Sequence, residues 1–154
     1  MSIRTCSLLA FSILLFACQN NSQQKENASS PVLSKEDSLY RAVIAFHDEV
    51  MPKMGKIEGY QKTVQAKLDS LNKVLVNQKN KTGHELKASY EALLAQLTDA
   101  EKGMTSWMDS FQPDPKLPSK EEIEKYWEAE YIKAKKMRDD FKAALDNAAL
   151  KLRQ

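Results

Sequence analysis

Residues 86–111 carry apolar side chains at intervals that alternate between four and three positions without a break. Apolar residues separated by about 3.5 positions form a single stripe along an α-helix. The positions are Leu86, Tyr90, Leu93, Leu97, Ala100, Met104, Trp107 and Phe111. A helix with such a stripe needs other helices to cover it, so the repeat predicts helix-on-helix packing.

Two further segments, 35–77 and 119–152, carry a related pattern. The first has apolar residues at Leu39, Val43, Phe46, Val50, Ile57, Tyr60, Val64, Leu71 and Val74. The second is looser, with Ile123, Trp127, Ala134, Met137, Phe141 and Ala148, and the polar Glu130 interrupts its stripe. Only four glycines and five prolines occur in 154 residues, a composition that favours long helices.

The expected helix starts share a hydroxyl residue followed, three positions later, by an acid. Such a hydroxyl accepts a hydrogen bond from the third backbone amide of the helix. The pairs are Ser34 with Asp37, Thr82 with Glu85, and Ser119 with Glu122. Between the helices lie a polar turn at 77–83 and a loop at 112–118 with three prolines, which a helix interior does not tolerate.

Short connections make neighbouring helices antiparallel. The sequence therefore predicts an all-α protein, an antiparallel up-down-up three-helix bundle over residues 34–154 with helices at about 35–77, 83–111 and 119–152. The alternative is a long intermolecular coiled coil, and the prolines at 113–118 argue against it.

The N-terminal segment 1–17 has the features of a secretion signal. Arg4 precedes an apolar stretch that is too short to span a bilayer. Its end, Leu15-Phe16-Ala17-Cys18, resembles the lipobox of bacterial lipoproteins. The resemblance implies cleavage after Ala17 and lipid attachment to Cys18, with acyl chains that hold the protein on a membrane. The alternative is an ordinary cleaved signal.

Residues 18–33 are expected to form a disordered tether, because they are rich in Asn, Gln and Ser and contain Pro31. Cleavage would remove Cys6, so the mature chain would keep Cys18 alone and form no internal disulfide. It would also remove Arg4 and lower the formal net charge from +2 to +1, which gives no electrostatic basis for nucleic-acid binding. We expect a lipid-anchored protein of the bacterial cell envelope that faces the periplasm.

The stretch HDEVMPKMG, residues 47–55, departs from the regular helical pattern. Pro52 cannot donate the backbone hydrogen bond of an α-helix, so a kink is expected there. His47, Met51 and Met54 are spaced by four and three positions and share one helical face.

A hairpin that turns near residue 80 brings Met51 and Met54 to the level of Met104, Trp107 and Met108 on the next helix. A second turn near residue 115 should bring Ile123, Tyr126 and Trp127 to the same end. The structural interpretation of this cluster is that methionines fill gaps between aromatic rings at the kink. The functional interpretation is a Cu(I) site.

In the Cu(I) interpretation, the ligands are His47, Met51, Met54, Met104 and Met108, because thioethers and imidazole favour Cu(I) over hard cations. Trp107 is then a cation-π neighbour of the metal. Zinc fits less well, since the mature chain has two histidines and an acylated cysteine.

The segments HDEVMPKMG and MTSWMDSF together resemble sequences in a group of small helical lipoproteins of the Bacteroidota type, which often carry the label "viral A-type inclusion protein". The resemblance covers the first two helices and, by composition, the third. It implies a helical envelope lipoprotein and brings no catalytic or binding residue with it.

We expect no enzymatic activity, because the glycines form no phosphate-binding loop and the paired acids on the helices point in different directions. Residues 35–48 should project past the end of the second helix with Leu39, Val43, Ile44 and Phe46 uncovered. The leading hypothesis is therefore a non-enzymatic interaction or structural module that binds a protein partner, or a second copy, through 35–48. Periplasmic Cu(I) binding is the alternative.

Overall fold

The computed structural model describes residues 33–76 and 78–153. It contains the helices α1 (Lys35–Val50), α2 (Met54–Leu75), α3 (Lys81–Ser110) and α4 (Lys120–Lys151), and the single 3-10 turn η1 (Met51–Lys53) joins α1 to α2. Taken together, α1 and α2 form the first of three antiparallel helices, so the predicted all-α bundle is confirmed. The signal segment 1–17, Cys18 and the tether up to residue 32 lie outside the described residues.

Two of the three expected helix caps are present. Ser34 Oγ accepts from the backbone amide of Asp37 at 3.0 Å, and Ser119 Oγ accepts from that of Glu122 at 3.2 Å. The expectation for Thr82 was wrong, because Asn80 caps α3 by accepting from the Gly83 amide at 3.0 Å. Asn is as good a capping residue as Thr, and its position lets the helix begin at Lys81.

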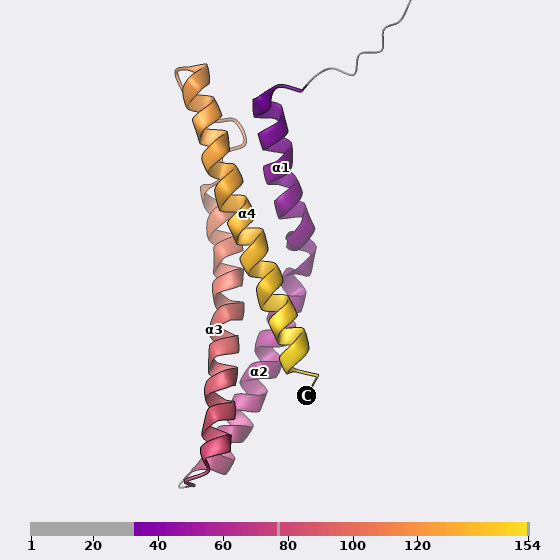
Figure 1. Ribbon diagram of the computed structural model, residues 1–154, viewed down its shortest axis with the longest axis vertical. Helices are drawn as coiled ribbons and strands as arrows, with labels where there is room; N and C mark the ends of the chain where they lie inside the picture. The colour runs from indigo at the N-terminus through magenta and orange to yellow at the C-terminus, as the bar shows by residue number, and fades with distance from the viewer. Residues whose placement is uncertain (1–32, 77, 154) are drawn as a thin grey trace, which may run out of the picture. The chain divides into compact units, whose positions relative to one another are not determined.

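The helices are arranged so that α1 and α2 run in the same direction as α4, whereas α3 runs back between the two connections (Figure 1). The segment α1 packs mainly on α4, α2 packs mainly on α3, and α3 packs on both α2 and α4. The path of the chain bends at η1, where α1 passes into α2 (Figure 1). This bend agrees with the effect expected of Pro52, the second residue of η1.

The bend leaves the heptad phase of the core intact. Val43, Val50, Ile57 and Val64 follow one another at intervals of seven, and all four are fully buried. Two of them lie before η1 and two after it. The short 3-10 turn therefore changes the direction of the helix while the same face remains turned to the bundle interior.

The connection between α3 and α4 shifts these helices relative to the expected level. The Trp107 indole meets Glu130, and Lys151 near the end of α4 bonds to Ser89. The Tyr126 hydroxyl holds the connection by donating to the carbonyl of Gln112 at 2.9 Å and accepting from its amide at 3.0 Å. As a result, the first turns of α4 run on past the end of α3 and lie beside α1 (Figure 1).

This shift covers the part of α1 that the sequence left exposed. Val43 is fully buried, the Tyr40 and Trp127 rings are 5.1 Å apart, and the Phe46 and Tyr131 rings are 5.3 Å apart. The apolar side chains of 35–48 thus find much of their cover on α4 of the same chain. The expectation that these side chains are uncovered is therefore wrong for most of them, and binding of a partner through 35–48 stays a prediction.

At the opposite end, two residues assigned to the core are exposed, namely Leu86 at 45% and Val74 at 59%. The cause is again the shift of α4, which ends at Lys151, level with Ser89, and does not reach the α2–α3 turn. Leu68 and Leu75 take the buried positions on α2 instead.

Candidate functional site

A buried carboxylate lies at the centre of the aromatic end of the bundle. Glu130 is 3% exposed, and its two oxygens accept from different donors. The Trp107 indole donates to Oε2 at 3.0 Å, and the Lys133 ammonium donates to Oε1 at 2.7 Å. Burial of a charged group requires such partners, so the polar residue that interrupts the α4 stripe is matched by an aromatic donor on α3.

Trp107 also contacts two further rings. Phe111 stacks on it with ring centroids 4.7 Å apart, and His47 approaches with centroids 5.7 Å apart. The Nδ1 atom of His47 lies 2.9 Å from Oδ1 of Asp48, and the imidazole is partly exposed. The structure therefore brings together the two segments, HDEVMPKMG and MTSWMDSF, that stood out in the sequence.

The four methionines of the predicted Cu(I) site differ in their access to solvent. Met51 is 39% exposed, whereas Met104 is fully buried in the core. Met54 and Met108 are half-buried, at the start of α2 and near the end of α3. Met54 and Met108 lie at one level of the bundle. Gln61 donates to Glu101 at 2.7 Å, Met54 is seven residues before Gln61, and Met108 is seven residues after Glu101 on the antiparallel helix, which is about two turns in the same direction.

The arrangement thus has a partly exposed imidazole on His47, an exposed thioether on Met51, and a buried thioether on Met104, about one turn before Trp107 on α3. Phe111 stacks on the Trp107 ring. In the described part of the chain, no three His, Cys, Asp or Glu side chains converge in a way that could hold a metal ion. The ligand set for Cu(I) would have to come from the thioethers and His47.

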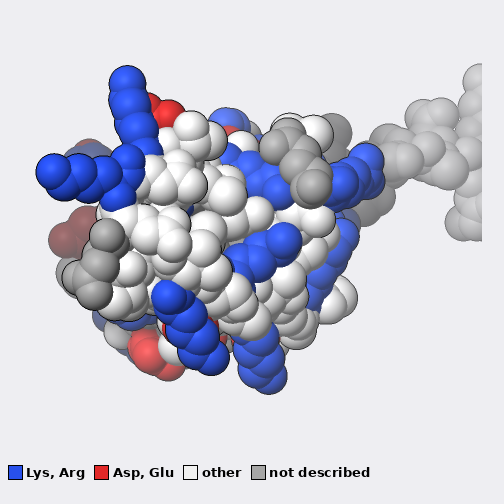
Figure 2. Space-filling view, turned by 90° about the horizontal axis from the view of Figure 1, so that it is seen from below, with Lys and Arg blue, Asp and Glu red and all other residues white. Residues whose placement is uncertain are grey.

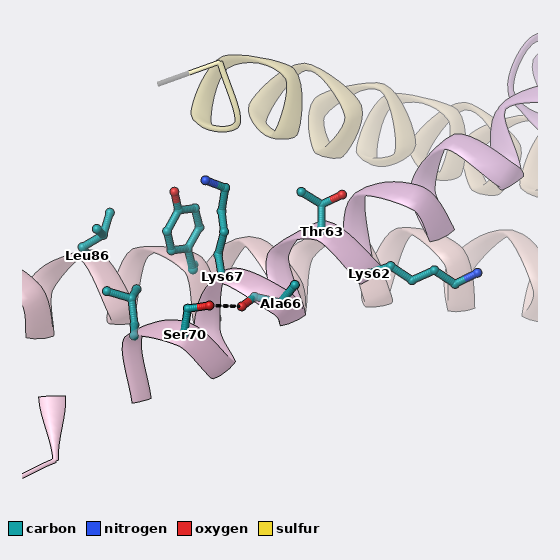
Figure 3. A pocket seen from close by; sticks show the side chains of 8 residues that line it. Lys62, Thr63, Ala66, Lys67, Ser70 and Leu86 are labelled. Carbon is teal, nitrogen blue, oxygen red and sulfur yellow. Dashed lines mark hydrogen bonds between the residues drawn. The ribbon is translucent and has the colours of Figure 1, made fainter. Parts of the chain in front are cut away.

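A second candidate site lies at the other end of the bundle, between α2 and α3. It is a groove of about 770 Å³ that begins where α4 ends (Figure 3). Its lining is Lys62, Thr63, Ala66, Lys67, Ser70, Leu71, Leu86 and Tyr90. Leu86 and Tyr90 come from α3, the other residues come from α2, and Lys151 of α4 lies beside both Leu86 and Tyr90.

The groove combines apolar side chains with ammonium groups. In Figure 3 the side chains of Leu86, Thr63 and Lys67 stand on the same side of the two helices. The Lys67 ammonium lies 5.6 Å from the centre of the Tyr90 ring, and Tyr90 is only 8% exposed. Among the described residues, neither Lys62 nor Lys67 has a carboxylate within ion-pair distance, so both ammonium groups are available to a ligand.

The surroundings of the groove are basic. Viewed from this end, an uncharged surface is bordered by Lys and Arg side chains (Figure 2). Residues 62–87 contain six lysines and two acidic residues, whereas residues 119–130, at the other end of the bundle, contain five acidic residues and two lysines. The charges of the bundle are therefore separated along its helices.

Comparison of the chain with protein-family models, curated proteins and solved structures gives no match. The resemblance to small envelope lipoproteins stays a prediction from sequence. None of the helices in 33–76 and 78–153 has the length and apolar character needed to cross a membrane.

Sequence reasoning missed the groove because it assigned Leu71 and Leu86 to a continuous core. A tight turn near residue 115 would have set Leu86 opposite Ala144, under the cover of α4. The contact between Ser89 and Lys151 instead sets Leu86 level with the end of the chain. The signal available in the sequence was the excess of lysines at 62–87, because lysines beside an apolar stripe indicate that this part of the stripe lies near solvent.

Proposed function

We propose that this protein is a lipid-anchored, non-enzymatic interaction module of the bacterial cell envelope that faces the periplasm. One observation carries the proposal. The bundle begins with α1 at one end, whereas the α2–α3 hairpin lies at the other (Figure 1). The residues that line the apolar, lysine-rimmed groove belong to α2 and α3 near this hairpin.

The distance between the two ends suits such a role. About 30 residues separate the start of α1 from Lys67, and helical residues advance about 1.5 Å each, so the groove lies roughly 45 Å from the point where the tether joins. With Cys18 acylated in a membrane, the bundle would act as a spacer that presents the groove away from the bilayer. The lipobox resemblance and the polar tether composition support this arrangement.

The anchor is tested by growing cells with an alkyne analogue of palmitate. We expect label on the wild-type protein and recovery with the membrane fraction, and loss of both in Cys18→Ser. An unlabelled wild type, or a serine variant that stays equally membrane-bound, would overturn the anchor.

The interaction role is tested by placing a photocrosslinking amino acid at position 86 in the lipidated protein in cells. Ile132, which is 68% exposed on α4 away from the groove, is the matched control position. We expect discrete protein adducts from position 86 and none from position 132. Equal patterns from both positions would contradict a binding role for the groove.

Cu(I) binding is the second candidate, favoured by the contact between the His47 and Trp107 rings and by the shared level of Met54 and Met108. It needs the thioether of Met51 to bind the same ion as the imidazole of His47, which lies one turn earlier.

A further inference from the structure

We infer that the groove between α2 and α3 binds an acidic, amphipathic α-helix of another protein, which takes the place of a third helix beyond the end of α4. This inference rests on the proposed function as an interaction module and names the chemistry of the partner. Three features of the groove favour this partner: the position of the groove in the bundle, its surface relief and its charge.

The position of the groove favours a helix. Along most of α3, residues of α4 complete the core. The last of them are Leu145 and Ala148, followed by Leu152 just after the helix. Beyond the level of Lys151, α2 and α3 continue as a two-helix hairpin that α4 does not cover (Figure 1). A further helix laid along Leu71 and Leu86 would restore the three-helix packing that the rest of the bundle uses.

The surface relief of the groove favours a helix over a bilayer. Tyr90 is 8% exposed and Leu71 is half-buried, whereas Leu86 beside them is 45% exposed, so the floor of the groove lies lower than the Leu86 side chain. Side chains from a helix can enter such a depression as knobs into holes. A bilayer would instead meet the apolar residues at the tip of the hairpin, Val74 and Val76, which are 59% and 65% exposed.

The charge of the groove selects the sign of the partner. Lys62 and Lys67 border it, Lys151 lies at its upper end, and no acidic residue lines it. Glutamate or aspartate beside the apolar stripe of a bound helix would pair with these ammonium groups. A second copy docked hairpin to hairpin would bring an end of the same positive sign. Its acidic segment 119–130 already packs its apolar face on α1, with Trp127 buried against Tyr40, so self-association through the groove is disfavoured.

The tether of the same chain is also a poor occupant. Residues 18–33 contain Glu26 as their one acidic residue and lack a helical apolar stripe. The occupant therefore has to come from another protein.

The test uses the full-length lipidated protein in detergent micelles and two fluorescent 21-residue helical peptides with identical leucine stripes. One peptide carries glutamate beside the stripe and the other carries lysine. Fluorescence anisotropy should show binding of the acidic peptide at least about tenfold tighter than the basic one, since two or three rim pairs change sign. Equal binding of both peptides would overturn the inference.

Variants locate the binding. The pair Lys62→Glu and Lys67→Glu should weaken the acidic peptide by about tenfold or more and strengthen the basic one. The matched control, Lys116→Glu with Lys120→Glu, reverses two lysines at the far end and should leave both affinities unchanged. Leu86→Ala should weaken both peptides. A control as strong as the rim variants would show a non-specific charge effect and would also overturn the inference.

Vesicles of phosphatidylglycerol test the other class of partner. Binding to these vesicles that is lost in Val74→Ser with Val76→Ser, together with no preference for the acidic peptide, would identify a bilayer contact and overturn the inference. Adducts from position 86 in cells combined with equal peptide binding would leave the proposed function standing and remove the acidic helix. Absence of those adducts would remove both.

Discussion

The Lys142 ammonium on α4 donates to Glu49 at the end of α1, with Nζ and Oε1 2.6 Å apart. The two residues are 93 positions apart, and the same separation joins Lys35 to Glu128 in a second ion pair at the other end of α1. The two pairs lie two heptads apart and have opposite polarity. A shift of α1 along α4 would break both pairs, so they specify the register in which these parallel helices pack.

The first prediction concerns the pH dependence of the Glu49 contact. The hydrogen bond from Lys142 holds the pKa of Glu49 below its usual value of 4.5. A carboxyl with a lowered pKa in the folded state stabilises the fold above its unfolded pKa, and the contribution disappears as the pH falls through the folded pKa. Glu49→Gln should therefore be less stable than wild type at pH 7, and the difference should close below about pH 4.5.

Urea denaturation followed by circular dichroism at pH 7 and at pH 3 measures this difference. Glu58→Gln, an exposed carboxyl on α2 for which the structure records no ion pair, is the control. A Glu49→Gln deficit that persists unchanged at pH 3 would show that the ion pair is not its cause.

The bundle was predictable because its main determinants are local. The heptads of 86–111, the capping hydroxyls at Ser34 and Ser119, and the prolines at 112–118 each act within a few residues. The hairpin level was predictable too, since a short turn fixes it, and Gln61 pairs with Glu101 close to the expected register. Side-chain type alone also marked Glu130 as the unusual residue of its stripe.

The level of α4 was not predictable in the same way. It depends on how far the connection at 111–119 extends, and this is decided by tertiary contacts such as Tyr126 with Gln112. Helix α4 lies about two turns from its expected level along α3. The exposed apolar surface is therefore found at the groove with Leu71 and Leu86, whereas it was expected at residues 35–48. The length of the connection at 111–119 therefore explains both why 35–48 was expected to be uncovered and why the groove was not expected.

The second prediction concerns the buried contact between Trp107 and Glu130. Trp107→Phe removes the indole donor and leaves Oε2 of Glu130 without it, at a cost of about 1–3 kcal/mol in the free energy of unfolding. Adding Glu130→Leu to this variant should recover a large part of the loss, because a well-packed apolar pair carries no unpaired buried charge.

Urea unfolding of the two single variants and the double variant gives the coupling. Trp127→Phe is the matched control, since Trp127 is buried but donates to no carboxylate among the described residues. Additive losses from Trp107→Phe and Glu130→Leu would contradict the predicted coupling.

The third prediction separates metal binding from packing at the His47 end. If the thioethers and imidazole form a Cu(I) site, His47→Ala with Met51→Leu should weaken Cu(I) binding at least about tenfold, because both changed groups are the solvent-accessible ligands. The measurement is a titration of the folded protein against a Cu(I) chelator. Met137→Leu on α4, outside the proposed ligand set, is the control. Equal weak affinities of wild type and double variant would remove the metal hypothesis and leave the packing interpretation.

The fourth prediction compares two glycines on α3. A Cβ atom at Gly103 meets nothing within 4 Å, so Gly103→Ala should raise the free energy of unfolding by about 0.5–1 kcal/mol through helix propensity. At Gly83 a Cβ would lie 2.6 Å from Cδ2 of Leu75, which is buried, so the gain there should be offset by displacement of Leu75.

Chemical denaturation should rank Gly103→Ala above wild type and above Gly83→Ala. In a Leu75→Ala background the contact with Leu75 disappears, and Gly83→Ala should then stabilise the fold. Equal gains from both substitutions in the wild-type background would contradict the prediction. They would show that the Leu75 side chain can move away from a Cβ at position 83 at little cost in the free energy of unfolding.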